Sequence, residues 1–213
     1  MRIAIRIVSL LSVLALFGCL DIYEHVSREA NGNINVYLKL TVAKSLLSMS
    51  NSGSDTPNTN PFDSITGPNG SEVTKEITDV LKGTLTKVDT ELETGLAIQL
   101  SLNLKSKDVQ SYLQSNDVPL LPKIDDKRIV FSFSNPSSSS TEDNQMGMAL
   151  LSSYKFRLTI SKTVCRSISK VVLSTDEVDY KPQIVSLPDM FLIEVPLSYL
   201  MKSSQKTELI VYK

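Results

Sequence analysis

The sequence predicts an α+β domain in which a mainly antiparallel sheet carries two or three short helices. Three observations lead to this fold class: several segments alternate apolar and polar residues with a period of two, an Asn-Gly pair separates two such segments, and two short stretches have helical spacing. With 213 residues, 41% of them hydrophobic, the chain is long enough to bury one sizeable core. We therefore expect a single domain over residues 19–213.

Residues 1–18 are set apart from the fold because they have the composition of a signal peptide. Arg2 and Arg6 form a positively charged start, and an apolar run follows at residues 7–17. This run is too short to span a membrane, which takes about 20 residues. The segment ends in Leu16-Phe17-Gly18-Cys19, which resembles the bacterial lipobox; Phe17 is a departure of the kind that spirochaetal lipoboxes tolerate.

The resemblance to the lipobox implies that Cys19 is the lipidation site and the first residue of the mature chain. Two or three acyl chains, palmitate among them, would anchor the protein stably, since each buried methylene contributes about 0.8 kcal/mol. Leu20 after the cysteine favours the outer membrane over the inner one, under the sorting rule of enteric bacteria. The alternative is an ordinary signal peptide whose cleavage site happens to lie near a cysteine.

The first structural element after Cys19 is a predicted β-hairpin. Residues 20–29 lead into Asn31-Gly32, and apolar residues then alternate from Ile34 to Val42. Asn-Gly between two such segments predicts a type I′ turn, because both central residues of that turn have positive φ. Residues 43–50 could continue the strand or form a short helix.

The middle of the chain combines a loop, two helices and a strand. Residues 51–70 are rich in Pro, Gly and Asn, which predicts a mobile loop. One-sided apolar spacing predicts short helices at 71–82 and 106–115, and regular alternation predicts a strand at 96–104. Residues 84–93 have no clean apolar face.

The last third of the chain is denser in predicted strands. Besides a strand at 129–133, alternation or short apolar runs predict strands at 154–160, 168–173, 183–185, 191–195 and 209–212. Pro182, Pro188 and Pro196 require these strands to be short or to lie at sheet edges.

The order of these elements resembles that of the mycobacterial LppM-like lipoprotein domain. There too, a lipobox cysteine precedes a hairpin with Asn-Gly or Asp-Gly, followed by helices and a strand of the type seen here in Tyr154-Lys155-Phe156-Arg157-Leu158. The resemblance covers residues 19–42 and 154–195. It implies a similar fold and assigns no functional residue; the terminal membrane helix of that family has no counterpart in this sequence.

Metal or nucleophilic chemistry would have to use His25 and Cys165, because Cys19 is consumed by acylation. A metal site needs clustered ligands, and a cysteine nucleophile needs a base, for which His25 is the sole imidazole. We interpret His25 as a strand surface residue near the membrane, with pH sensing as the alternative. We interpret Cys165 as a buried thiol, with an intermolecular disulfide as the alternative.

Other catalytic motifs are missing from the sequence. It contains neither Gly-x-Ser-x-Gly nor a glycine-rich phosphate loop, and its carboxylate pairs, Asp125-Asp126, Glu142-Asp143 and Asp176-Glu177, flank predicted turns where solvated roles are usual. A formal charge of -1 argues against nucleic-acid binding, which requires several phosphates to be neutralised. We therefore expect no catalytic residue, no metal and no cofactor.

The function expected from these observations is that of a non-enzymatic envelope lipoprotein. It would be attached to the membrane by its N-terminal lipid and would bind another envelope or host component, a protein or lipid whose identity and binding residues the sequence does not reveal. One alternative is a lipid or glycolipid carrier with an apolar cavity. A second alternative is a hydrolase of unrecognised type.

Overall fold

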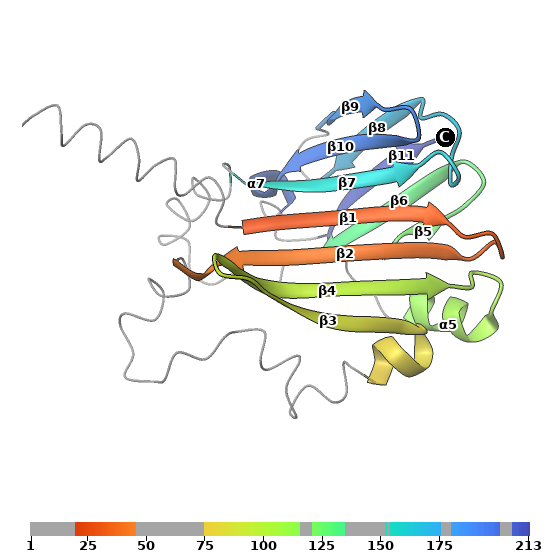
Figure 1. The fold of residues 1–213 in the computed structure, drawn as a ribbon. Coiled ribbons are helices and arrows are strands. Elements are labelled where there is room, and N and C mark those ends of the chain that lie inside the picture. The colour runs from red at the N-terminus through yellow and green to blue at the C-terminus, as the bar shows by residue number, and fades with distance from the viewer. Residues whose placement is uncertain are drawn as a thin grey trace, which may run out of the picture.

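Two facing β-sheets make up most of the computed structural model (Figure 1), which describes residues 20–45, 75–115, 121–134, 152, 154–175, 180–200 and 206–213. Sheet A has seven strands in the order β3-β4-β2-β1-β7-β10-β9, and sheet B has four in the order β5-β6-β11-β8. The strands of sheet A are β1 (Leu20–Arg28), β2 (Ile34–Ala43), β3 (Gly83–Asp89), β4 (Glu93–Leu102), β7 (Lys155–Ser161), β9 (Gln183–Ser186) and β10 (Met190–Pro196). Those of sheet B are β5 (Lys123–Ile124), β6 (Arg128–Ser134), β8 (Lys170–Ser174) and β11 (Lys206–Tyr212).

The core lies between the two sheets. Apolar side chains alternate along the strands of both sheets and are fully buried on the facing sides, among them Phe156, Leu158 and Ile160 of β7 and Phe131 of β6. An edge-to-face contact between Phe133 of β6 and Phe156, with ring centroids 5.4 Å apart, joins the two layers. Among the described strands, β1 and β7 run parallel near the centre of sheet A, and the other pairs are antiparallel.

The predicted α+β class is wrong, because the protein is a β-rich sandwich. Among the described residues, the named helices are η2 (Glu76–Val80), α5 (Lys107–Ser115) and α7 (Leu197–Leu200). They lie at the ends of the strands (Figure 1), and none of them covers a sheet face. Each places one or two side chains in or against the core, such as Ile77, Val109 and Leu197. Sheet B covers the inner face of sheet A instead.

Strand β3 accounts for part of this error. It occupies Gly83–Asp89, where the sequence predicts no element. As an edge strand it exposes Thr84, Thr86 and Lys87, so no apolar face marks it in the sequence. By contrast, β4, β6, β7, β8, β9, β10, β11 and α5 lie where strands and a helix are predicted.

The hairpin after residue 19 is confirmed, but its turn is not of type I′. Strands β1 and β2 pair from Leu20 with Val42 to Arg28 with Ile34. Gly32 has φ of 89°, whereas Asn31 is not among the residues with positive φ. The N–H of Gly32 donates to the carbonyl of Glu29 at 3.0 Å, and the N–H of Glu29 donates to that of Asn33 at 2.9 Å. This pattern is a type I turn followed by a glycine bulge.

Several sequence predictions fall outside the described residues: the signal peptide at 1–18, Cys19, the mobile loop at 51–70, the start of the helix at 71–82, and the carboxylate pairs Glu142-Asp143 and Asp176-Glu177. Within the described part, none of the helices is long and apolar enough to cross a membrane.

Candidate functional site

The outer face of sheet A carries two neighbouring rows of uncharged side chains. The strand register aligns seven residues across the sheet in a first row: Thr84, Gln99, Tyr37, His25, Thr159, Leu192 and Val185. The next outward-facing residues along the five central strands form a second row: Ser101, Asn35, Ser27, Ser161 and Met190. We call these twelve residues the uncharged rows.

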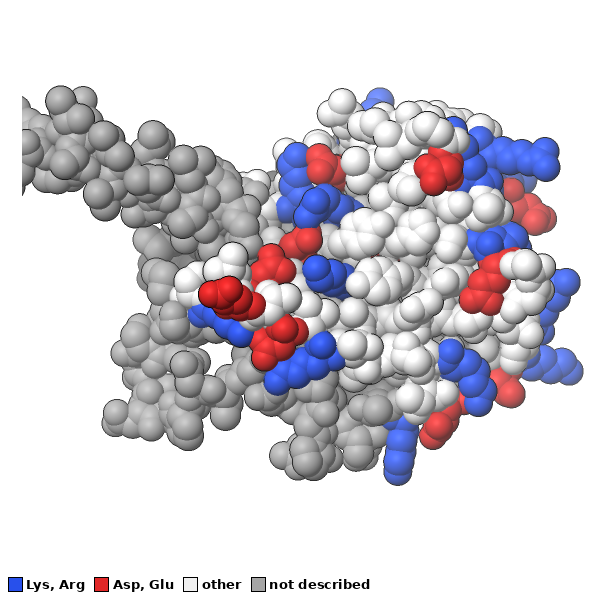
Figure 2. Space-filling model, in the orientation of Figure 1, with Lys and Arg blue, Asp and Glu red and all other residues white. Residues whose placement is uncertain are grey.

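Charged side chains occupy the half of the same face in which β1 begins. Arg157 pairs with Asp21, and Lys155 pairs with Glu194 at 2.8 Å. In Figure 2, red and blue atoms gather at this end and around the opposite rim, and a white band crosses the face between them. Side chains on this face are therefore segregated by charge along the strands.

A threonine hydroxyl organises the centre of the uncharged rows. The Oγ1 atom of Thr159 lies 2.9 Å from the Tyr23 hydroxyl, 2.9 Å from Nδ1 of His25 and 3.3 Å from the Glu24 carbonyl oxygen. A threonine hydroxyl donates once and accepts twice. Thr159 therefore satisfies all three contacts if it donates to the Glu24 carbonyl and accepts from Tyr23 and from an Nδ1–H of His25.

The surroundings of His25 favour the neutral form of its imidazole. Partial burial lowers the pKa of its imidazole, and the negative charge of Asp189 opposes this shift. If Nδ1 carries the proton and donates to Thr159, Nε2 is the acceptor on the other side of the ring. The ring of Tyr37 follows on β2, where its centroid lies 6.3 Å from that of Tyr23. The rows thus combine aromatic surface with neutral hydrogen-bonding groups.

The Thr159–His25 pair has the spacing of a nucleophile and its base but not the accessibility. Thr159 is only 5% exposed, and its hydroxyl proton is directed to the Glu24 carbonyl. The pair therefore holds the sheet surface in place. Sequence reasoning did not find it, because the two residues are 134 positions apart and no local motif links them.

Cys165 is not brought together with His25. The thiol is free, 5% exposed and packed in the core between the sheets, while His25 lies on the outer face of sheet A. Burial raises the pKa of the Cys165 thiol, with a smaller opposite effect from Lys213, so the thiolate required of a nucleophile is disfavoured. Within the described residues, no three His, Cys, Asp or Glu side chains form a group that could hold a metal ion.

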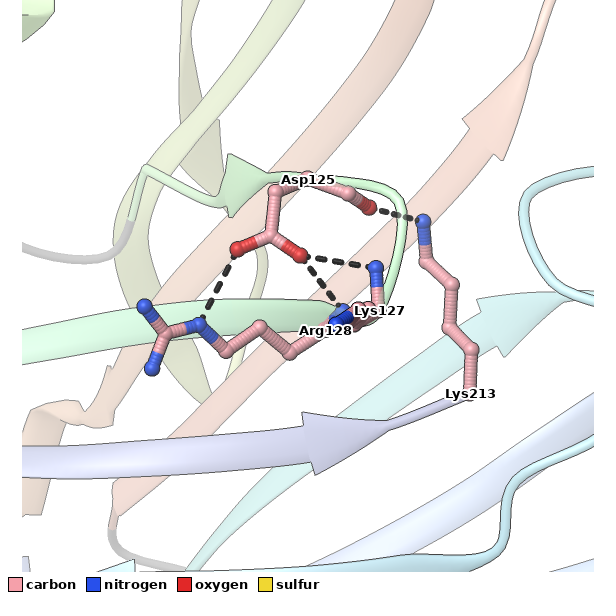
Figure 3. A network of polar contacts seen from close by, with 4 residues as sticks. All are labelled: Asp125, Lys127, Arg128 and Lys213. Carbon is pink, nitrogen blue, oxygen red and sulfur yellow. Dashed lines mark hydrogen bonds and ion pairs between the residues drawn. The ribbon is translucent and has the colours of Figure 1, made fainter.

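Asp125 stabilises an exposed turn of sheet B (Figure 3). Its carboxylate accepts hydrogen bonds from the backbone N–H groups of Lys127 and Arg128, both at 2.8 Å, and forms an ion pair with the Arg128 side chain at 3.0 Å. The Lys213 ammonium donates to the Asp125 carbonyl at 2.5 Å. The bond from Lys127, followed by the Arg128 contacts, lowers the pKa of Asp125. These contacts give the carboxylate of Asp125 a structural role in the β5–β6 turn.

Comparison with protein-family models gives no match, and comparison with curated proteins gives none either. Among solved structures, the chain is similar to the folded domain of the LppM protein of Mycobacterium tuberculosis, with a TM-score of 0.39 and 10% sequence identity. The similarity covers 91% of this chain and 88% of that one. LppM is also the protein whose domain the order of sequence features resembles, and no residue role is transferred from it.

Proposed function

We propose that this protein is a non-enzymatic, lipid-anchored envelope protein that binds another envelope or host component through the uncharged rows of sheet A. The observation that carries the proposal is the segregation of charge on the outer face. Every strand of sheet A contributes an uncharged residue to one of these rows, while the ion pairs lie nearer the start of β1.

The position of the proposed anchor supports this use of the face. Strand β1 begins at Leu20, immediately after Cys19, so a lipid on Cys19 would leave almost no linker. At about 3.3 Å per residue, His25 lies roughly 17 Å and Ser27 roughly 23 Å along β1 from Leu20. The charged end of the face would then meet the lipid headgroups, and the uncharged rows would stand farther from the membrane.

The chemistry of the rows favours a partner surface that is itself uncharged. Interface cores are depleted in charged residues, because desolvating a charge is costly. They are enriched in tyrosine and methionine. Tyr37, Leu192, Met190 and Val185 supply apolar contact area, and Val185 is 41% exposed. Gln99, His25 and Thr84 supply neutral hydrogen-bonding groups between them.

The two alternatives make different demands on the molecule. A hydrolase would need an accessible nucleophile, which the buried Thr159 hydroxyl and the Cys165 thiol do not supply. A lipid carrier would need an apolar cavity between the sheets. The binding proposal is preferred because it requires only an outer sheet face whose accessible side chains include Gln99 and Val185.

The proposal is tested with charge insertions at two positions of the first row, Gln99 on β4 and Val185 on β9. Acylated protein in liposomes is incubated with purified envelope proteins, envelope glycans or extracellular host proteins, and retention is measured by flotation. Gln99→Glu and Val185→Glu should each weaken retention of the partner by about tenfold or more, as for residues in an interface core.

Thr86→Glu is the matched control, since Thr86 is exposed on the same face but lies in a row that already contains charges. It should change retention less than about twofold. Equal losses in all three variants, or no loss in either row variant, would contradict the assignment of the binding surface.

A further inference from the structure

Glu24 is a buried carboxyl group on the inner face of β1, with 0% of its surface exposed. Among the residues that the structure describes, neither of its carboxyl oxygens has a hydrogen-bond partner. Its cross-strand neighbours are Leu38 of β2 and Leu158 of β7. Ile22 and Val26 occupy the adjacent inner positions of its own strand. The side chain thus stands where the sandwich otherwise places aliphatic residues.

No described group is positioned to neutralise Glu24. The inner faces of β6, β11 and β8 in sheet B contribute uncharged residues: Ile129, Phe131, Phe133, Thr207, Leu209, Val211, Val171 and Leu173. The titratable members of the core and of the residues packed on it are the Cys165 thiol and the phenols of Tyr112, Tyr154 and Tyr180, and none bonds to Glu24. The Asp and Lys side chains of β3 are exposed at the sheet edge.

An ionised carboxylate is not compatible with this environment. A charge moved from water into an apolar interior without a partner is so unfavourable that the group takes up a proton instead. Burial accordingly raises the pKa of Glu24 well above its ordinary value. The described environment therefore favours the protonated form of Glu24.

We propose that Glu24 is a proton-dependent switch in the packing of the two sheets. With the proton bound, the carboxyl is neutral and sheet B closes over it. When the proton passes to solvent, the carboxylate has to be hydrated, and the sheets separate around β1 to admit water. This inference concerns the interior and is independent of the binding surface proposed above.

The test compares the full-length protein with Glu24→Gln, which keeps the shape of the side chain but cannot ionise. Urea unfolding is followed from about pH 5 to about pH 9. In the wild type, the equilibrium constant for unfolding should rise by up to about tenfold per pH unit, the limit for one proton, until the folded pKa is passed. In Glu24→Gln this rise should be lost. Because His25 is present in both proteins, its own titration cancels in the comparison.

Glu194→Gln is the control, because Glu194 is a partly exposed acid of sheet A paired with Lys155. It should keep the wild-type pH profile. Separation of the sheets is followed with a dye that fluoresces on exposed apolar surface: its signal should rise with pH in the wild type while the far-ultraviolet β signal persists. Parallel pH profiles for wild type and Glu24→Gln, or a dye signal that does not change with pH, would overturn the proposal.

Discussion

Replacement of Thr159 by valine tests the hydroxyl network at the centre of the outer face. Valine keeps the shape and β-branching of threonine but removes the hydroxyl that contacts Tyr23, His25 and the Glu24 carbonyl. Each of the two 2.9 Å bonds contributes about 0.5 to 1.5 kcal/mol net, and the 3.3 Å contact contributes less. Because Tyr23 and His25 are only half-buried, water can replace part of what they lose. We therefore expect Thr159→Val to lower the free energy of unfolding by about 1 to 3 kcal/mol.

The assay is urea denaturation followed by circular dichroism. With a slope of about 1 to 3 kcal/mol per molar urea, the expected loss moves the midpoint by roughly 1 M. Thr86→Val is the control, since Thr86 is exposed on the same face and its replacement should stay within about 0.5 kcal/mol. The imidazole ¹⁵N shifts of His25 should also change in Thr159→Val, because Nδ1 loses its hydrogen-bond partner. A urea midpoint within about 0.2 M of wild type, which is on the order of the measurement error, together with unchanged ¹⁵N shifts, would refute the network.

Four further predictions concern the hairpin turn, the close contact between β4 and β2 at Gly95, the anchor and the histidine. Gly32→Val should cost about 1 to 3 kcal/mol through strain at φ of 89°, although a Cβ there would meet no atom within 4 Å. Gly95→Ala should cost at least as much, because its Cβ would lie 2.0 Å from the Leu40 carbonyl oxygen and would displace β4 from β2. Urea midpoints measure both losses. A wild-type midpoint would contradict the strain at Gly32 or the steric clash at Gly95, respectively. Cys19→Ala should abolish incorporation of radiolabelled palmitate and move the protein to the soluble envelope fraction, whereas labelling that persists would disprove lipidation at Cys19. Because burial lowers the folded pKa of His25, its contribution to stability is complete above the unfolded pKa of about 6.5 and is lost as the pH falls through the folded value. When the pH is lowered from about 7.5 to about 5.5, the free energy of unfolding should therefore fall less in His25→Asn than in the wild type. Equal decreases, measured by urea unfolding, would contradict this.

The strands that could be predicted are those with one solvent-exposed face and one buried face. In β7, Phe156, Leu158 and Ile160 alternate with Lys155 and Arg157, and this periodicity is visible because sheet B covers only one side. In β3 the pattern disappears, because this edge strand is mostly exposed and only Gly83 in it is buried. The fold class was wrong because periodicity does not distinguish one sheet from two, so helices were expected to cover a face that sheet B covers. The turn type was missed because Asn-Gly suits both a two-residue turn and a glycine bulge.

The candidate binding face depends on strand order, which the sequence does not display. His25 and Thr159 meet because β1 runs parallel to β7, a pairing between segments separated by more than 100 residues. The residues close to His25 in the sequence place it on the surface of a strand and do not reveal its partner. Only the register across all seven strands reveals that the uncharged positions fall into rows, since each strand contributes just one or two of them.

Glu24 is different, because its signal is local. In β1, Leu20, Ile22 and Val26 share one face, and strict alternation places Glu24 on that same face between them. A one-residue slip would move Glu24 to the outer face but would also turn Tyr23 and His25 inward, so no register of this strand buries only apolar residues. A charged residue at an inner position is thus readable from the sequence once the hairpin is accepted. The structure adds that the cross-strand neighbours of Glu24 are Leu38 and Leu158 and that no described group hydrogen-bonds to its carboxyl. Because burial of such a group favours its protonated form, the protonation of Glu24 is coupled to folding.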